Sequence, residues 1–185
     1  MKPTLTLADY QRAAQTLGCK VAAIMAVASV ESSGNGFYTD GSLKKKFEAH
    51  WFRYYTGKSV STYTEAYAID PKSAMLSTSW GKFQIMGFNH KISGYATVQA
   101  MVDAFNQNEQ THLSGFIGFI RDKKLEDELR NLNWTGFAYI YNGENYAKLG
   151  YHTKMAAAYA KFSTDPAIAE AEAEVKKKAR TIRCC

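Results

Sequence analysis

The feature that most constrains this chain is a mostly apolar run over residues 21–30 that ends in a carboxylate and then breaks. Glu31 follows the run directly, and Ser33-Gly34-Asn35-Gly36 then supplies strong helix-breaking residues. We predict a helix over residues 20–32. Its buried stripe should comprise Val21, Ile24, Met25 and Ala28. The run is too short to span a bilayer, so the helix should lie in a protein core.

Glu31 stands where a carboxylate is poorly stabilised as an anion. The helix dipole disfavours negative charge at a C-terminus, and the apolar neighbours of Glu31 reduce its hydration. Both effects favour the protonated acid, which could donate to a leaving-group oxygen. Asp40 follows at a predicted Asp40-Gly41 hairpin turn, where water should keep it ionised. Such a pair suits glycosidic hydrolysis; alternatively, Glu31 merely ends a surface helix and Asp40 merely forms a turn.

The remaining pattern predicts a mainly α protein with one small β-hairpin, over residues 37–47, after the Glu31 helix. A Thr6/Asp9 capping box should open the first helix, and Gly18 should close it. Further helices should begin after Asp70, Asn133 and Asp165. We expect only helices beyond Glu48, in one domain over residues 1–164 with a basic C-terminal helix over residues 165–185 packed on it or appended to it.

The positive charge is concentrated at the end of the chain. The 185 residues include 23 Lys and Arg against 17 Asp and Glu, a net charge of +6. Five of the basic residues are Lys176, Lys177, Lys178, Arg180 and Arg183; without them the balance is 18 to 17. A nucleic-acid-binding domain carries basic residues through its body, so this class is excluded. The end could contact an anionic membrane or lipopolysaccharide, or be a solvated helix.

The N-terminus and the cysteines bear on location. No basic start leads into an apolar run, so we expect synthesis in a host cytoplasm without a signal peptide. Cys19, Cys184 and Cys185 cannot pair evenly, which argues against a disulfide framework. His50, His90, His112 and His152 are far apart and predict no metal site. We expect no metal and no organic cofactor.

Three motifs carry a resemblance to a known family. They are the run from Val21 to Phe37 with Asp40-Gly41 and Phe47-Glu48-Ala49-His50, the segment Ser79-Trp80-Gly81-Lys82-Phe83-Gln84-Ile85-Met86-Gly87-Phe88-Asn89, and Tyr141-Asn142-Gly143. In order and spacing they resemble the phage-type N-acetylmuramidase (endolysin) family, over most of Leu5 to Phe162. The resemblance implies a lysozyme-like fold. It also implies hydrolysis of the β-1,4 bond between N-acetylmuramic acid and N-acetylglucosamine in peptidoglycan, and cell lysis.

The resemblance also assigns catalytic residues. Glu31 occupies the position of the family's catalytic glutamate. Asp40 has the spacing of the second carboxylate of other phage lysozymes, but Lys46 stands where those enzymes have a threonine. Glu48 is therefore the rival second carboxylate, or else it holds a strand or pairs with Arg53.

Four further residues are implied to bind substrate, each with a structural alternative. Gln84 would line the cleft and bond a sugar N-acetyl group, or be a core amide bonded to backbone. Tyr141 would face the catalytic glutamate beside Asn142, or this pair would only end a helix. Trp80 would stack on a sugar face, or be a buried indole.

The functional prediction is a monomeric peptidoglycan hydrolase that acts on the cell wall, in the periplasm, after its release. Two alternatives remain at this point. A lytic transglycosylase would use one glutamate and leave a 1,6-anhydro end, and a non-catalytic module would only bind peptidoglycan.

Overall fold

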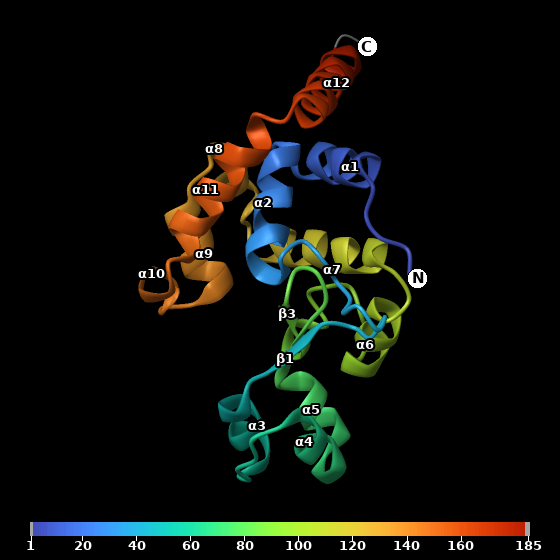
Figure 1. Ribbon diagram of the computed structural model, residues 1–185, viewed down its shortest axis with the longest axis vertical. Coiled ribbons are helices and arrows are strands. Elements are labelled where there is room, and N and C mark those ends of the chain that lie inside the picture. Colours follow the sequence, from blue (N-terminus) through green and yellow to red (C-terminus); the bar gives the residue numbers. More distant parts are fainter. Residues whose placement is uncertain (1, 184–185) are drawn as a thin grey trace. The chain divides into compact units, whose positions relative to one another are not determined.

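The computed structural model describes residues 2–183, so Cys184 and Cys185 lie outside the described residues. The chain folds into two compact units, whose helices and strands are labelled in Figure 1. The first unit contains residues 2–4 and 35–119, and the second contains residues 5–34 and 120–183. Each unit thus combines segments that are far apart in the sequence.

The first unit is built on a small sheet with helices around it. Its elements are β1 (Lys45–Phe47), α3 (Ala49–Thr56), α4 (Tyr63–Ile69), α5 (Pro71–Leu76), β2 (Thr78–Trp80), β3 (Ile85–Met86), the 3-10 helix η1 (Gly87–Asn89), α6 (Val98–Phe105) and most of α7 (Glu109–Asp122). The second unit is helical. It comprises α1 (Leu7–Leu17), α2 (Val21–Ser32), the end of α7, α8 (Glu126–Asn131), α9 (Trp134–Asn142), α10 (Tyr146–Leu149), α11 (Tyr151–Ser163) and α12 (Pro166–Arg183).

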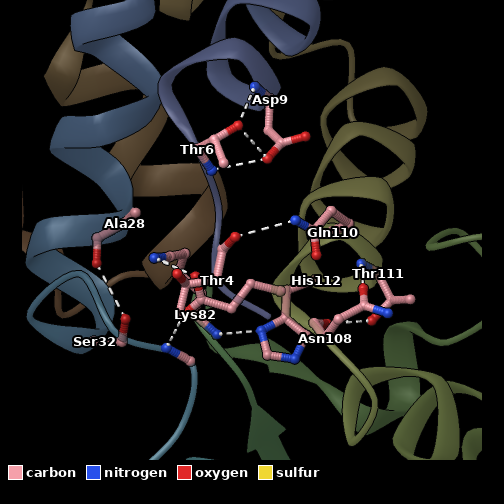
Figure 2. A network of polar contacts seen from close by, with 12 residues as sticks. Thr4, Thr6, Asp9, Ala28, Ser32, Lys82, Asn108, Gln110, Thr111 and His112 are labelled. Atoms are coloured by element: carbon pink, nitrogen blue, oxygen red, sulfur yellow. Dashed lines mark hydrogen bonds and ion pairs between the residues drawn. The ribbon is translucent and has the colours of Figure 1, made fainter. Parts of the chain in front are cut away.

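Local capping chemistry sets several helix ends, as predicted. Thr6 and Asp9 form the capping box of α1: the Asp9 N–H donates to Thr6 Oγ1 over 3.3 Å, and the Thr6 N–H donates to Asp9 Oδ2 over 2.8 Å (Figure 2). Gly18 closes α1 in the left-handed region, with φ of 66°. Asp70 and Asn133 cap α5 and α9 through the N–H groups three residues on.

The predicted hairpin is present, but the prediction of only helices after Glu48 was wrong. Phe37 and Leu43 form an antiparallel bridge, and the Tyr38 N–H donates to the Ser42 carbonyl over 2.8 Å. β1 continues into an antiparallel sheet of order β1-β2-β3. Strands of two or three residues are too short to show an alternating pattern, and β1 and β2 pair from distant parts of the sequence.

Helix α2 is the core helix of the second unit. Val21, Ile24 and Val27 are fully buried, whereas Met25, predicted to be buried, is partly exposed. The α2 helix packs against α1, α11 and α12. In the described part of the chain no single helix is long and apolar enough to cross a membrane; α1 and α2 pass that test only as a pair, which is bent by 112°.

The first half of α12 packs within the second unit. Ile168 and Ala171 are buried, and Glu172 Oε1 accepts the backbone N–H of Ala22 over 3.1 Å. Gln11 of α1 donates to the Ala171 carbonyl. This half of the helix is therefore tied to both α1 and the N-terminus of α2.

Candidate active site

Glu31 lies in the last turn of α2 and is partly buried. Asn142, the last residue of α9, donates its side-chain N–H to Glu31 Oε1 over 2.8 Å. Gly143 ends α9 with φ of 81°, a conformation that favours glycine. The Asn142-Gly143 pair therefore both terminates a helix and brings an amide donor to the Glu31 carboxylate.

Tyr141 lies beside the same carboxylate. Its ring stacks on Phe137, with centroids 5.0 Å apart. Burial raises the pKa of Tyr141 well above its usual value, and the negative charge of Glu31 raises it further. The phenol consequently stays neutral at physiological pH and keeps its proton for hydrogen bonding. The second unit thus brings together Glu31, Tyr141 and Asn142 from two sequence motifs.

Asp40 lies in the hairpin of the first unit and is exposed. The hydroxyl and the backbone N–H of Ser42 donate to Asp40 Oδ1, over 2.6 and 2.8 Å. These hydrogen bonds lower the pKa of Asp40. The side chain is therefore ionised in water at neutral pH.

Glu48, the rival carboxylate, precedes α3 and pairs with a lysine. Lys46 Nζ lies 2.7 Å from Glu48 Oε1, and His50 Nδ1 lies 3.8 Å from Glu48 Oε2. Glu48 therefore pairs with Lys46 and not with Arg53, the partner that the sequence analysis gave as one alternative.

Gln84 follows the turn between β2 and β3 in a left-handed conformation, with φ of 48°. Its amide oxygen accepts the Ser79 hydroxyl over 2.8 Å, and its amide nitrogen donates to the Gly81 carbonyl over 2.8 Å. One amide proton and one oxygen lone pair remain for a ligand. The strained backbone and the two hydrogen bonds hold this amide in one orientation.

For Trp80 the structure supports the buried alternative and not the sugar-stacking one. Only 3% of the residue is exposed, and its indole N–H donates to the Met75 carbonyl over 3.1 Å. Its ring meets Tyr63 edge to face. An indole buried on all sides cannot stack on a sugar, so Trp80 is a core residue that holds β2 against α5.

A buried charged network in the first unit was not anticipated from the sequence (Figure 2). Lys82 Nζ lies 2.8 Å from Glu109 Oε2, and their side chains are 6% and 1% exposed. Glu109 Oε1 also accepts the Gly36 N–H over 2.6 Å. His112 is fully buried; its Nδ1 accepts the Lys82 N–H over 3.1 Å, so the ring is neutral and Nε2 donates to the Phe105 carbonyl.

This network connects the start of α7 with two loops that carry predicted site residues. Gly36 leads into the hairpin with Asp40, and Gly81 leads into the turn with Gln84. A Cβ on Gly36 would lie only 2.5 Å from Nδ1 of His112, and a Cβ on Gly81 would lie 2.8 Å from the same atom. Both loops therefore touch the ring through bare backbone. No local pattern reveals the network, because Lys82 and Glu109 look like ordinary surface charges in the sequence.

No metal site accompanies these residues: within residues 2–183, no group of three His, Cys, Asp or Glu side chains could hold an ion. Cys19 is a buried free thiol, and burial raises its pKa to about 12, which makes it an inert core residue.

Comparison with known proteins identifies the family. A model of the N-acetylmuramidase family matches residues 20–65 and 58–163. The chain belongs to this family. Among solved structures it resembles the crystal structure of an endolysin from the Burkholderia phage AP3, at 35% identity and a TM-score of 0.74, over 86% of this chain and 71% of that one. No curated protein sequence matches the chain.

Membership in the N-acetylmuramidase family makes this protein a peptidoglycan hydrolase of the glycoside hydrolase type. The mainly helical fold with its small antiparallel sheet, together with the phage endolysin neighbour, confirms the predicted lysozyme-like fold. The matched residues include Glu31, Asp40, Glu48, Gln84, Tyr141 and Asn142. The match does not extend to α1 or α12.

Proposed function

We propose that this protein is an endolysin that hydrolyses the β-1,4 bond between N-acetylmuramic acid and N-acetylglucosamine and so lyses bacterial cells. The observation that carries the proposal is the partly buried Glu31 carboxyl at the end of an apolar helix, held by the amide of Asn142. The helix C-terminus disfavours its negative charge, and the amide fixes its orientation.

In the proposed mechanism Glu31 is the general acid. Its proton passes to the glycosidic oxygen as the bond to the anomeric carbon breaks, and the sugar develops oxocarbenium character. The neutral hydroxyl of Tyr141, next to this carboxyl, supplies a polar surface without a competing charge. Asn142 is a positioning residue, because it acts on the substrate through the orientation of Glu31.

Asp40 is the proposed base. It is ionised and exposed, and Ser42 orients one of its oxygens, so the other is available to a water molecule. Glu48 is the weaker candidate because Lys46 already compensates its charge. Asp40 takes a proton from the water as that water attacks the anomeric carbon directly, and this single displacement gives inversion, which is the stereochemistry we propose.

The ends released from purified peptidoglycan test the proposal. We expect reducing ends by mass spectrometry, and their loss by more than about a hundredfold in Glu31→Gln. Glu170→Gln, at an exposed carboxylate of α12, serves as the control and should match the wild type. Products with 1,6-anhydro ends would make the protein a lytic transglycosylase, and binding without products would make it a binding module.

The second carboxylate is tested by a matched pair of variants. Asp40→Asn should lose most of the activity, and Glu48→Gln should keep most of it. Exogenous azide should rescue Asp40→Asn, and NMR should show the inverted anomer as the first product. The reverse ranking would assign the base to Glu48, and a retained anomer would replace water activation by a covalent intermediate.

We further propose that the basic end of α12 binds an anionic membrane or lipopolysaccharide. The five basic residues after Val175 support this proposal. We also propose that the protein is made in the cytoplasm and acts on the cell wall as a monomer. A chain cut after Phe162 would also lose the packing of Ile168 and Ala171, so truncation is a poor test. Replacing Lys176, Lys177 and Lys178 by glutamine should abolish salt-sensitive vesicle binding, with wall hydrolysis unchanged; undiminished binding would disprove the proposal. Size-exclusion chromatography tests the monomer.

A further inference from the structure

Helix α3 carries a cluster of aromatic rings outside its core contact. Phe52 forms the core contact of this helix: it is fully buried with Ala66 and Ala74. Trp51, Tyr54 and Tyr55 are spaced three and four positions apart and so share another face of α3. Tyr54 is 75% exposed and Tyr55 is 38% exposed. Large exposed rings grouped in this way mark a binding surface.

The rings support one another in fixed orientations. The ring centroid of Trp51 lies 5.7 Å from that of Tyr54 and 6.4 Å from that of Tyr55, and Trp51 also meets Phe88 of η1 edge to face with centroids 4.9 Å apart. Tyr54 and Tyr55 lie 5.3 Å apart, also edge to face. Trp51 therefore anchors two tyrosines whose outer surfaces are free of the core. Rigid rings lose little conformational entropy when a ligand stacks on them.

Basic side chains predominate on this helix. Helix α3 contains Arg53 and no acidic residue. Arg53 and Lys58 are exposed, as is Lys46, whose ammonium pairs with Glu48 at the start of the helix. A ligand of this surface should therefore present flat apolar faces, hydroxyl groups and negative charge. We call the side chains of Trp51, Arg53, Tyr54 and Tyr55 the α3 surface.

We propose that the α3 surface binds the glycan strand of peptidoglycan outside the bond that is cleaved, a proposal that rests on the function proposed above. Sugar rings offer C–H faces that stack on tyrosine, and their hydroxyls accept and donate at the ring edges. The stem peptides of peptidoglycan carry carboxylates that the basic residues attract. A long polymer continues past the scissile bond, so an enzyme gains affinity by contacting more of it.

Strand pairing and a hydrogen bond also link helix α3 to Gln84, a predicted substrate residue of the first unit. β1 leads directly into α3, and Lys46 of β1 pairs with Ser79 of β2. The Ser79 hydroxyl in turn donates to the amide of Gln84. One small sheet therefore connects the Gln84 turn with the aromatic helix.

The test measures binding without turnover. In a Glu31→Gln background, co-sedimentation with purified sacculi should weaken roughly fivefold for the Tyr54→Ala/Tyr55→Ala double variant, as expected for the loss of two ring contacts. Tyr139→Ala, a 55% exposed tyrosine of α9, is the matched control and should bind like the parent. Arg53→Gln should weaken binding to intact sacculi but not to strands whose stem peptides have been removed.

Unchanged sacculus binding by the double variant would overturn the proposal. A double variant that instead loses binding to anionic phospholipid vesicles would also overturn it, because the α3 surface would then be a membrane contact. A double variant that converts a dimer to a monomer in size-exclusion chromatography would overturn it as well, because the surface would then be a contact between two copies of the chain. Circular dichroism melting shows that each variant folds. The outcome is independent of the reaction type, because the release of reducing ends by the wild type tests that separately.

Discussion

Neutralising Glu109 should destabilise the protein far more than neutralising an exposed carboxylate. Glu109→Gln keeps an oxygen that can accept the Gly36 N–H, but it removes the negative charge 2.8 Å from the Lys82 ammonium. The side chain of Lys82 is 6% exposed, so water cannot replace the lost partner. The substitution therefore leaves a buried cation without this counter-charge.

The magnitude follows from the burial of both charges. Removing one partner of a buried ion pair costs about 3–5 kcal/mol. For a chain of this length each kcal/mol lowers the melting temperature by about 2–4 °C, so we expect a loss of about 10 °C. Asp127→Asn breaks an exposed pair with Arg130, at 2.6 Å, and should change stability by less than about 1 kcal/mol.

Thermal and urea unfolding followed by circular dichroism measure both variants. The double variant Glu109→Gln/Lys82→Met should recover a large part of the loss, because it removes the buried lysine charge as well. A Glu109→Gln protein as stable as Asp127→Asn would refute the reasoning, since it would mean that Lys82 can reach water. A double variant less stable than Glu109→Gln would show that packing, and not charge, dominates at this position.

Three further predictions concern other parts of the protein. Burial lowers the pKa of His112 from 6.5 to about 4, so the folded protein binds this proton less readily than the unfolded chain does. The free energy of unfolding should therefore be at its maximum above about pH 6.5 and should fall by about 3 kcal/mol as the pH drops towards 4. Urea titrations should show this fall for the wild type and for His90→Gln, but not for His112→Gln. Glu172→Ala removes the carboxylate that accepts the Ala22 N–H and should cost about 1 kcal/mol in thermal unfolding, whereas Glu170→Ala, at an exposed carboxylate, should cost little. Trp80→Phe loses the bond to the Met75 carbonyl and should cost about 1–3 kcal/mol with KM for sacculi unchanged; a raised KM would return Trp80 to the substrate site.

Local chemistry made part of this structure predictable. The capping box of Thr6 and Asp9, the proline after Asp70 and the glycine after Leu17 each act within a few residues, so the sequence contains the whole signal. The same holds for Glu31, whose place at the end of an apolar helix is fixed by α2 alone. The family resemblance implied that Tyr141 faces Glu31 beside Asn142, but the hydrogen bond from Asn142 to Glu31 depends on the tertiary packing of α9.

The remaining features depend on contacts between distant residues. β2 pairs with β1 across helices α3 to α5, and neither strand is long enough to show a period of two. The buried network of Lys82, Glu109 and His112 exists only because the fold brings these residues together. In the sequence each one resembles a surface charge or a scattered histidine. The two alternatives for Trp80 could not be separated for the same reason: an indole gives the same sequence signal whether it faces a sugar or the Met75 carbonyl.

The contacts of α2 link the C-terminal segment to the helix that carries Glu31. Glu172 of α12 accepts the Ala22 N–H at the N-terminus of α2, where Lys20 also donates to the Tyr159 hydroxyl of α11 over 2.7 Å. Asn142 of α9 holds the other end through Glu31. These hydrogen bonds hold α2 at both of its ends. Loosening α12 should therefore reduce kcat through the position of Glu31, so activity lost on truncating this helix is no evidence by itself for membrane binding by its basic end.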